Sequence, residues 1–207
     1  MKKILVAIMA VFFSAPSFAQ YSSGGFSLDE SSVYYGLRLG VNFSGVGGDF
    51  DGWGTKTGIN LAGVVGLRLS DTAPVFLESG LYYTERGAKE DKNKMGLTYF
   101  ELPVLIKYGV QVSDDIAVLP YVGPYFSFGI AGQTKINGYG ENGAVYKKSS
   151  YKDFCNHADM GFKIGCGAEY NKLYAEIGYQ LGVANIAKDD DFSAHGHALY
   201  FNIGVNF

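Results

Sequence analysis

The strongest constraint on the fold of this chain is an alternation of apolar residues with polar or small ones. In the last nine residues, every second position from Leu199 to Phe207 is apolar, and Tyr, Asn or Gly fills the positions between. Successive residues of a strand point to opposite sides, so such a segment has one apolar and one polar face. The alternation predicts strands in the segments 33–43, 59–69, 160–170, 173–183 and 199–207 and, less regularly, 75–83, 97–108 and 116–130.

These eight segments have the length of membrane-crossing strands. A tilted strand needs about 9–11 residues to cross a bilayer, and a spanning sheet must close because unpaired backbone groups in hydrocarbon cost several kcal/mol each. The connections alternate in length, as in bacterial barrels with long extracellular loops and short periplasmic turns. The long ones are 44–57, 85–96, 132–157 and 187–195, and the short ones are 71–73, 111–115 and 171–172. We therefore predict an all-β fold: a closed antiparallel transmembrane β-barrel of about eight strands. A soluble β-sandwich, the alternative, has no reason to alternate its loop lengths.

The N-terminus predicts export. Lys2 and Lys3 precede an apolar run, 4–13, and Ser17 and Ala19 are small residues at the −3 and −1 positions of a cleavage site, which is typical of a secretory signal peptide. The run is too short to span a membrane as a helix. We predict a signal peptide over 1–19, a short periplasmic segment over 20–31, a barrel over 32–207, and location in the outer membrane.

Details of the predicted strands agree with a bilayer setting, with one exception. Aromatic residues near strand ends are expected to form the interfacial girdles of a barrel, namely Tyr35, Phe43, Tyr83, Tyr108, Tyr170 and Phe207. Phe207, an aromatic end to the last strand, is also expected to be the signal for the outer-membrane assembly machinery. The exception is three prolines, which cannot donate to a ladder. We expect bulges or frayed pairing at Pro103, Pro120 and Pro124.

The inward face of the predicted barrel carries charges of both signs. They are Arg38, Arg68, Glu78, Glu101, Lys107, Asp159, Lys163, Glu169 and Glu176. An eight-stranded barrel has an interior just wide enough for side chains or one small ligand. Buried charges persist when they are paired and hydrogen-bonded, so we predict a salt-bridge network in the lumen. An ion or proton path is one interpretation of this network, and a polar plug is the favoured one.

The sequence offers little for catalysis or for nucleic acid. The formal net charge of −3 gives no basic surface for nucleic acid. His195 and His197, two residues apart beside three aspartates at 189–191, have a spacing that a divalent metal can use, but a solvated loop is the favoured interpretation. No G-x-S-x-G motif is present. We therefore expect no enzymatic activity, cofactor or metal, and the alternative enzyme, a lipid-modifying or proteolytic barrel, would use His157 or His195.

The longest predicted loop is a candidate contact surface, and the two cysteines are candidates for a disulfide. The loop at 132–157 mixes tyrosines with lysines, which suits contact with glycans, proteins or lipopolysaccharide, although an ordinary solvated loop has the same composition. Cys155 lies in this loop and Cys166 lies in mid-strand on the lipid side. Eleven extended residues can separate them by more than about 30 Å, so we expect two free thiols.

Several stretches resemble the PorT-like outer-membrane β-barrel proteins of Bacteroidota. They are YGLRLGVNFS at 35–44, ESGLYY at 78–83, RGAK at 86–89, YFELPVLIKY at 99–108, with its proline, and VGPYF at 122–126. The resemblance covers nearly the whole chain after the signal peptide and implies that prolines are tolerated in these strands. The namesake of the family is needed for secretion across the outer membrane, and that role extends to this chain only by analogy of fold.

The expected function is accordingly that of a non-enzymatic outer-membrane barrel. It would act through its extracellular loops in a structural, adhesive or secretion-accessory role, and a small channel or ligand-binding barrel is the alternative. The expected partners are outer-membrane lipid and lipopolysaccharide, the barrel assembly machinery, and secretion-system or surface partners.

Overall fold

The computed structural model describes residues 33–48, 54–70, 72–90, 93–113, 115–136, 146–153, 155–188 and 193–207. The predicted signal peptide and the segment 20–31 lie outside them. The strands are β1 (Val33–Gly48), β2 (Gly54–Arg68), β3 (Val75–Glu90), β4 (Asn93–Tyr108), β5 (Val110–Ser113), β6 (Ile116–Ile136), β7 (Tyr146–Ser149), β8 (Ala158–Tyr170), β9 (Leu173–Gly182) and β10 (Ala194–Asn206), and one helical turn, α2 (Ser150–Asp153), follows β7. No helix in these ranges is long and apolar enough to cross a membrane.

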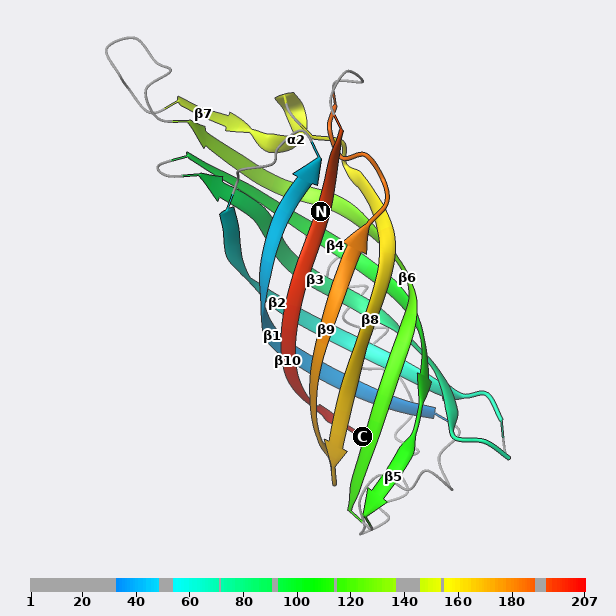
Figure 1. Ribbon diagram of the computed structural model, residues 1–207. Helices are drawn as coiled ribbons and strands as arrows, with labels where there is room; N and C mark the ends of the chain where they lie inside the picture. Colours follow the sequence, from blue (N-terminus) through cyan, green and yellow to red (C-terminus); the bar gives the residue numbers. More distant parts are fainter. Residues whose placement is uncertain are drawn as a thin grey trace, which may run out of the picture.

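Eight of the strands close into an antiparallel barrel, as the alternation predicts. The ring runs β1-β2-β3-β4-β6-β8-β9-β10 and returns to β1, while β5 and β7 are short additions to β6. Figure 1 shows a slanted cylinder with β5 and the C-terminus at one end, the lower end, and β7 and α2 at the other, the upper end. At the lower end of the β1–β10 seam, the amides of Tyr35 and Phe207 each donate to the other's carbonyl, at 3.0 and 2.8 Å.

Burial alternates along the strands in the predicted phase. On β9, Leu173 and Ile177 are 61% and 46% exposed, whereas Tyr174 and Glu176, which lie between them in the sequence, are buried. Of the aromatic residues assigned to girdles, five are exposed and Tyr83 is half-buried. The wall is therefore an apolar outer surface around a polar interior, the inverse of a soluble domain.

The strands reach further at the upper end than the sequence predicts. Most of the expected loops 44–57 and 85–96 is strand, because β1 runs to Gly48, β2 starts at Gly54, and β3 and β4 are interrupted only between Glu90 and Asn93. The period-2 pattern continues there on the inward face alone, and the outward positions turn polar or glycine. β6 is also longer: it pairs with β8 up to Phe128 and with β7 from Gln133 onwards.

Strand pairing lapses beside two of the three prolines without a shift of register, whereas Pro120 pairs with Cys166 of β8 in an unbroken run. Pairing between β3 and β4 lapses beside Pro103, whose carbonyl accepts a hydrogen bond of 2.7 Å from the Ser79 hydroxyl. Pairing between β4 and β6 lapses beside Pro124 in the same way. Of the two outcomes expected from the sequence, frayed pairing is confirmed at Pro103 and Pro124, whereas the register shifts lie elsewhere, between Thr98 and Tyr99 for example. A two-residue lapse leaves the facing backbone groups free to find side-chain partners.

Two facing glycines make room for a pair of tyrosines in the middle of the barrel. Gly165 of β8 pairs with Gly178 of β9, and the hydroxyls of Tyr121 and Tyr200 meet in front of them at 3.0 Å. A Cβ atom on either glycine would overlap the Tyr121 or Tyr200 side chain. Glycine is required here by the close approach of side chains.

Substitution of Gly178 by valine is expected to destabilise the barrel by about 1–3 kcal/mol, the usual cost of overpacking. The matched control is Gly196→Val on β10, where an added Cβ meets no atom within 4 Å. Urea unfolding in detergent micelles measures both. Equal stability of the two variants would show that the tyrosine pair does not need this space.

Candidate functional site

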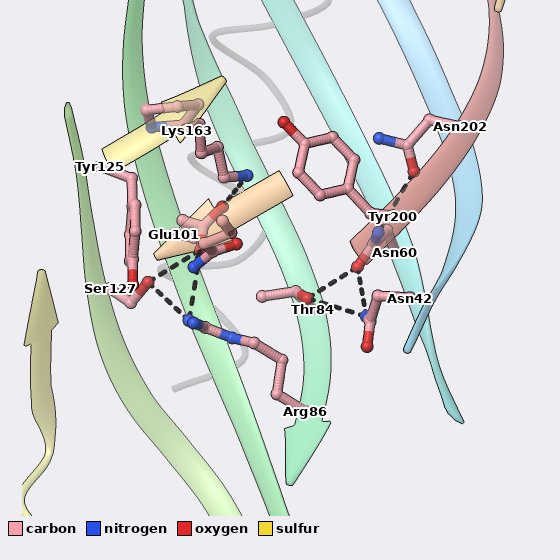
Figure 2. A network of polar contacts seen from close by, with 12 residues as sticks. Asn42, Asn60, Thr84, Arg86, Glu101, Tyr125, Ser127, Lys163, Tyr200 and Asn202 are labelled. Atoms are coloured by element: carbon pink, nitrogen blue, oxygen red, sulfur yellow. Dashed lines mark hydrogen bonds and ion pairs between the residues drawn. The ribbon is translucent and has the colours of Figure 1, made fainter. Parts of the chain in front are cut away.

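The upper half of the lumen is organised around a buried guanidinium group. Arg86, from the upper part of β3, contacts Asp159 Oδ2 at 3.0 Å and Glu101 Oε2 at 3.2 Å. It also donates to the Ser127 hydroxyl at 2.8 Å. Figure 2 shows Arg86 pointing toward Glu101 and Ser127, with Lys163 and Tyr125 beside them. One arginine therefore bridges side chains from three further strands.

Glu101 of β4 collects the other donors of this upper cluster. Lys163 of β8 forms an ion pair with its second oxygen. Ser127 of β6 and Gln180 of β9 each donate to Oε2 at 3.0 Å. The carboxylate is thereby linked to β3, β6, β8 and β9 at once. Such a charge is tolerated inside a protein because its lone pairs are filled by donors.

The lower half contains a second cluster around Glu78 of β3. Lys107 Nζ lies 2.8 Å from one carboxylate oxygen, and Arg38 Nη2 lies 3.5 Å from the other. The Tyr34 hydroxyl donates to the same carboxylate at 2.6 Å. All four side chains are buried. This lower cluster joins β1, β3 and β4 near the end where the C-terminus lies.

A chain of hydrogen bonds leads from the lower cluster up to the level of the upper one. Lys107 donates to the Tyr174 hydroxyl at 2.8 Å, and Tyr174 donates to Glu176 at 3.0 Å. Asn202 donates to Glu176 at 2.7 Å and accepts from Asn60 at 3.2 Å. Asn60 in turn accepts from Asn42 and Thr84, at 2.8 and 2.7 Å. We call Asn42, Asn60, Thr84 and Asn202 the Asn–Thr group. Figure 2 shows this group facing the Arg86–Glu101 pair.

Aromatic rings fill the space between the charges. The Arg38 guanidinium lies 3.9 Å from the centre of the Tyr174 ring, and that of Arg86 lies 4.2 Å from the centre of the Tyr99 ring. A cavity of about 10 Å³ remains between the Asn–Thr group and the upper cluster. That is roughly the space of one water molecule. The lumen is therefore a packed interior in which polar side chains alternate with small apolar clusters, such as Leu105 with Tyr121 and Tyr200.

Most of the lumen residues named from the sequence lie in these clusters. Eight of the nine are buried: Arg38, Glu78, Glu101, Lys107, Asp159, Lys163, Glu169 and Glu176. Glu169 stands apart from the ion pairs and accepts from the Asn206 amide at 2.7 Å. Arg68 differs: it is half-buried near the lower end, and its Nε donates to the Ser70 carbonyl at 2.8 Å. As the last residue of β2, it lies beyond the depth of the clusters.

Sequence reasoning misses the arginine at the centre of the upper cluster. It places Arg86 in a loop, because the outward residues around it, Glu85 and Gly87, are not apolar. The signal is present on the other face, where Tyr82, Thr84, Arg86 and Ala88 continue the inward positions of β3. A chain leaving the bilayer loses its outer apolar residues first, while its inward pattern persists.

Apolar side chains cover the polar lumen at its upper end. Tyr151 of α2, with Cys155 and Ile186 from the connections, packs on inward residues of the strands; the other members of this cap are Val46, Ala88, Met95, Leu97, Tyr99, Ala187 and Ala194. Tyr151 donates to the Thr98 carbonyl at 3.1 Å and stacks on His157, whose ring centre is 4.8 Å away. Burial raises the pKa of the Cys155 thiol to about 11. The connections thus complete a small hydrophobic core.

His157 and His195, the histidines named as candidates from the sequence, contact backbone carbonyls and one hydroxyl. A ring nitrogen of His157 lies 2.7 Å from the Gly129 carbonyl oxygen. His195 contacts the Ala184 carbonyl and the Ser193 hydroxyl, both at 3.1 Å. In the described residues no cluster of three or more His, Cys, Asp or Glu could hold a metal ion, and the aspartates 189–191 lie outside those residues. Both cysteines are free thiols, as expected.

Comparisons with known proteins find outer-membrane barrels. The family model described as "Outer membrane protein beta-barrel domain" matches residues 18–188. No curated protein sequence matches the chain. A major outer membrane protein from Thermus thermophilus is similar in structure, with 14% identity, a TM-score of 0.52, and coverage of 86% of this chain and 100% of that one.

Two further solved structures are similar at the same identity, 14%. Neisserial surface protein A has a TM-score of 0.47, with 86% of this chain and 98% of that one covered. Ail, the attachment invasion locus protein of Yersinia pestis, has a TM-score of 0.45, with 86% and 100% covered.

Substitution of Arg86 by methionine is expected to destabilise the barrel by about 3–5 kcal/mol, because it leaves the buried Asp159 without its cation. The matched control is Arg68→Met, which removes an arginine that is half-buried and hydrogen-bonded to a single carbonyl; its expected cost is at most about 1 kcal/mol. Urea unfolding of the folded protein in micelles compares them. If both variants unfold at the same urea concentration, the upper cluster does not stabilise the barrel.

Proposed function

The chain belongs to the outer membrane protein beta-barrel domain family, and on this basis we propose that it is a non-enzymatic outer-membrane barrel with a closed lumen. Its role would be structural, adhesive or secretion-accessory and would be exerted through the upper end, which we assign to the cell exterior. The lumen would serve the protein itself, as the core that holds its strands together.

The filled lumen is the observation that supports this proposal. An ion crossing the barrel would have to pass the Glu78 cluster, the Glu101 cluster and then the apolar cap. Separating one partner of a buried ion pair from the other costs about 3–5 kcal/mol. Two such clusters in series, with a cavity the size of about one water molecule beside the upper one, favour a plug over a conduit.

The proposal includes export and assembly of the chain. Cleavage of a signal peptide after Ala19 would release the mature chain into the periplasm, and the β10 strand with Phe207 would present the assembly signal to the barrel assembly machinery. Phe207 is 60% exposed on the outer surface, which suits recognition before the strand pairs with β1. The surrounding partners would then be outer-membrane lipid and lipopolysaccharide.

Secretion is the finer role that the resemblance to PorT-like barrels supports. In this proposal the upper end, with the β6–β7 hairpin and the connections around α2, contacts secretion-system or surface partners. The enzymatic alternative rests on a single contact, between the Ser193 hydroxyl and His195 Nε2 at 3.1 Å. A hydrolytic activity of the purified protein that His195→Ala abolishes would replace the proposal.

The purified protein is expected to show no ion conductance in a planar bilayer, because the lumen is filled by paired charges and covered by the apolar cap. Flotation of proteoliposomes from the same preparation controls for insertion. Stepwise currents from inserted wild-type protein would overturn the closed lumen and favour the small channel.

A strain lacking the gene is expected to accumulate a set of exported proteins in the periplasm if the secretion role is correct. Comparison of its surface, secreted and periplasmic proteomes with those of the parent measures this, and complementation with the intact gene controls for polar effects. Unchanged export would reject the secretion role and leave the structural and adhesive ones.

A further inference from the structure

Lysines from adjacent strands form a row across the outer face of the barrel near its upper end. Lys89 of β3 pairs with Lys94 of β4, and Lys94 pairs with Lys135 of β6. All three are exposed. Paired residues on antiparallel strands have Cβ atoms about 4.5–5.5 Å apart and share a face of the sheet.

The lysine row faces outward, on the same side as the lipid-facing residues. On β4 the positions alternate without a register shift against β3, so Lys94 has the phase of Phe100 and Leu102, which are 38% and 48% exposed. β6 carries one extra residue where its register with β4 shifts, between the partners of Thr98 and Tyr99. That residue reverses the phase of β6 and brings Lys135 to the outer face.

The lysine row concentrates positive charge that the described part of the chain does not neutralise. Like charges directly opposite one another on neighbouring strands are destabilising. The ion pairs found among described residues all lie in the lumen, and none includes Lys89, Lys94 or Lys135. The three lysines repel one another although the chain as a whole is acidic, with a net charge of −3. An anionic partner bound to the row would offset this repulsion.

A band of small and polar residues separates the lysine row from the aromatic row below it. The aromatic row is Tyr83, Phe100 and Phe128, which are paired across the same three strands. Between the rows lie two registers: Glu85, Thr98 and Ala131, then Gly87, Gly96 and Gln133. Glu85, the acid in this band, is half-buried and accepts a hydrogen bond of 3.1 Å from the Tyr83 hydroxyl.

The height of this band suits a saccharide. Six residues separate Phe100 from Lys94, about 20 Å along the strand at roughly 3.3 Å per residue, or about 15 Å along the barrel axis at the usual tilt of roughly 40°. At Gly96 an added Cβ would meet nothing closer than the Gln133 carbonyl at 3.5 Å. The Lys56 side chain crosses the band beside Gly87 and Gly96, and its Nζ donates to the Arg86 carbonyl at 3.2 Å. We call this band of small and polar residues the shelf; it lies above the aromatic row, and the ammonium groups of the lysine row bound its upper edge.

We propose that this shelf and the lysine row bind the phosphorylated saccharide of lipopolysaccharide in the surrounding outer leaflet. The acyl chains would lie along the apolar wall below the aromatic row, the sugars would lie on the Gly–Thr–Gln shelf, and phosphate groups would meet the lysines. The row faces sideways from the barrel wall, so its partner is a molecule of the same leaflet. This inference rests on the proposed outer-membrane location.

The test is binding of purified lipopolysaccharide, with its phosphorylated core, to the folded protein in detergent micelles. The variant is K89Q/K94Q/K135Q, and the control K152Q/K172Q/K188Q removes the same charge from other parts of the surface. A lysine near an anionic lipid surface contributes about fivefold in affinity, so the row variant is expected to bind at least tenfold more weakly. The control is expected to stay within about twofold of the wild type. Heat-dependent gel mobility shows that each variant is folded.

Two further arms identify the source of the anion. Dephosphorylated lipopolysaccharide is expected to bind wild type and row variant equally weakly. Dextran sulfate serves as the soluble polyanion, and the row variant is expected to bind it no more weakly than the control does. A row variant that binds lipopolysaccharide as well as the control overturns the proposal, and so does a loss confined to dextran sulfate. Membrane fractionation separates the two proposals: failure to reach the outer membrane rejects the proposed function, whereas unchanged binding by an outer-membrane protein rejects the lysine row alone.

Discussion

The structure depends on the requirement that every backbone amide and carbonyl in a bilayer be paired within the sheet. The pairing of β1 with β10 satisfies it by leaving the eight-stranded wall without an edge. Closure fixes the other properties of the molecule. It turns the apolar side chains outward, where lipid replaces a hydrophobic core, and it encloses a space that side chains of the opposite phase must fill.

That enclosed space is stabilised by chemistry unlike that of a soluble domain. In this barrel the hydrophobic contribution comes from the wall, the apolar cap and three small apolar clusters in the lumen, and the lumen is also held by ion pairs around Glu78 and Glu101. Each of these carboxylates receives donors from several strands, so it acts as a tie between distant parts of the ring. Tyrosines bridge the two chemistries because each has a ring to pack and a hydroxyl to donate. Glycines such as Gly178 provide the space for those rings.

Much of this arrangement could be predicted from the sequence, and the parts that could not have a physical reason. Period-2 alternation specifies strands and faces, so the eight strands, and the burial of side chains such as Glu101 and Lys163, follow from local pattern. The burial of Arg86 was not predicted, because the apolar pattern on the outward face ends at the membrane boundary whereas the inward pattern continues beyond it. The apolar cap was not predicted, because irregular connections bring Tyr151, Cys155 and Ile186 together. The lysine row was not predicted, because it depends on how β3, β4 and β6 are paired and on one extra residue in β6.

The cap also limits how this protein can diverge. Surface loops ordinarily accumulate substitutions and insertions freely, since few of their residues are buried. Here the connection after β7 supplies Tyr151 to a buried cluster, and the connection after β9 supplies Ile186. Under selection to vary its exposed surface, for example by immune or phage recognition, the chain can change the tips of these connections but must conserve the positions that point inward. Its exposed surface is thus expected to evolve as short hypervariable patches separated by invariant anchors.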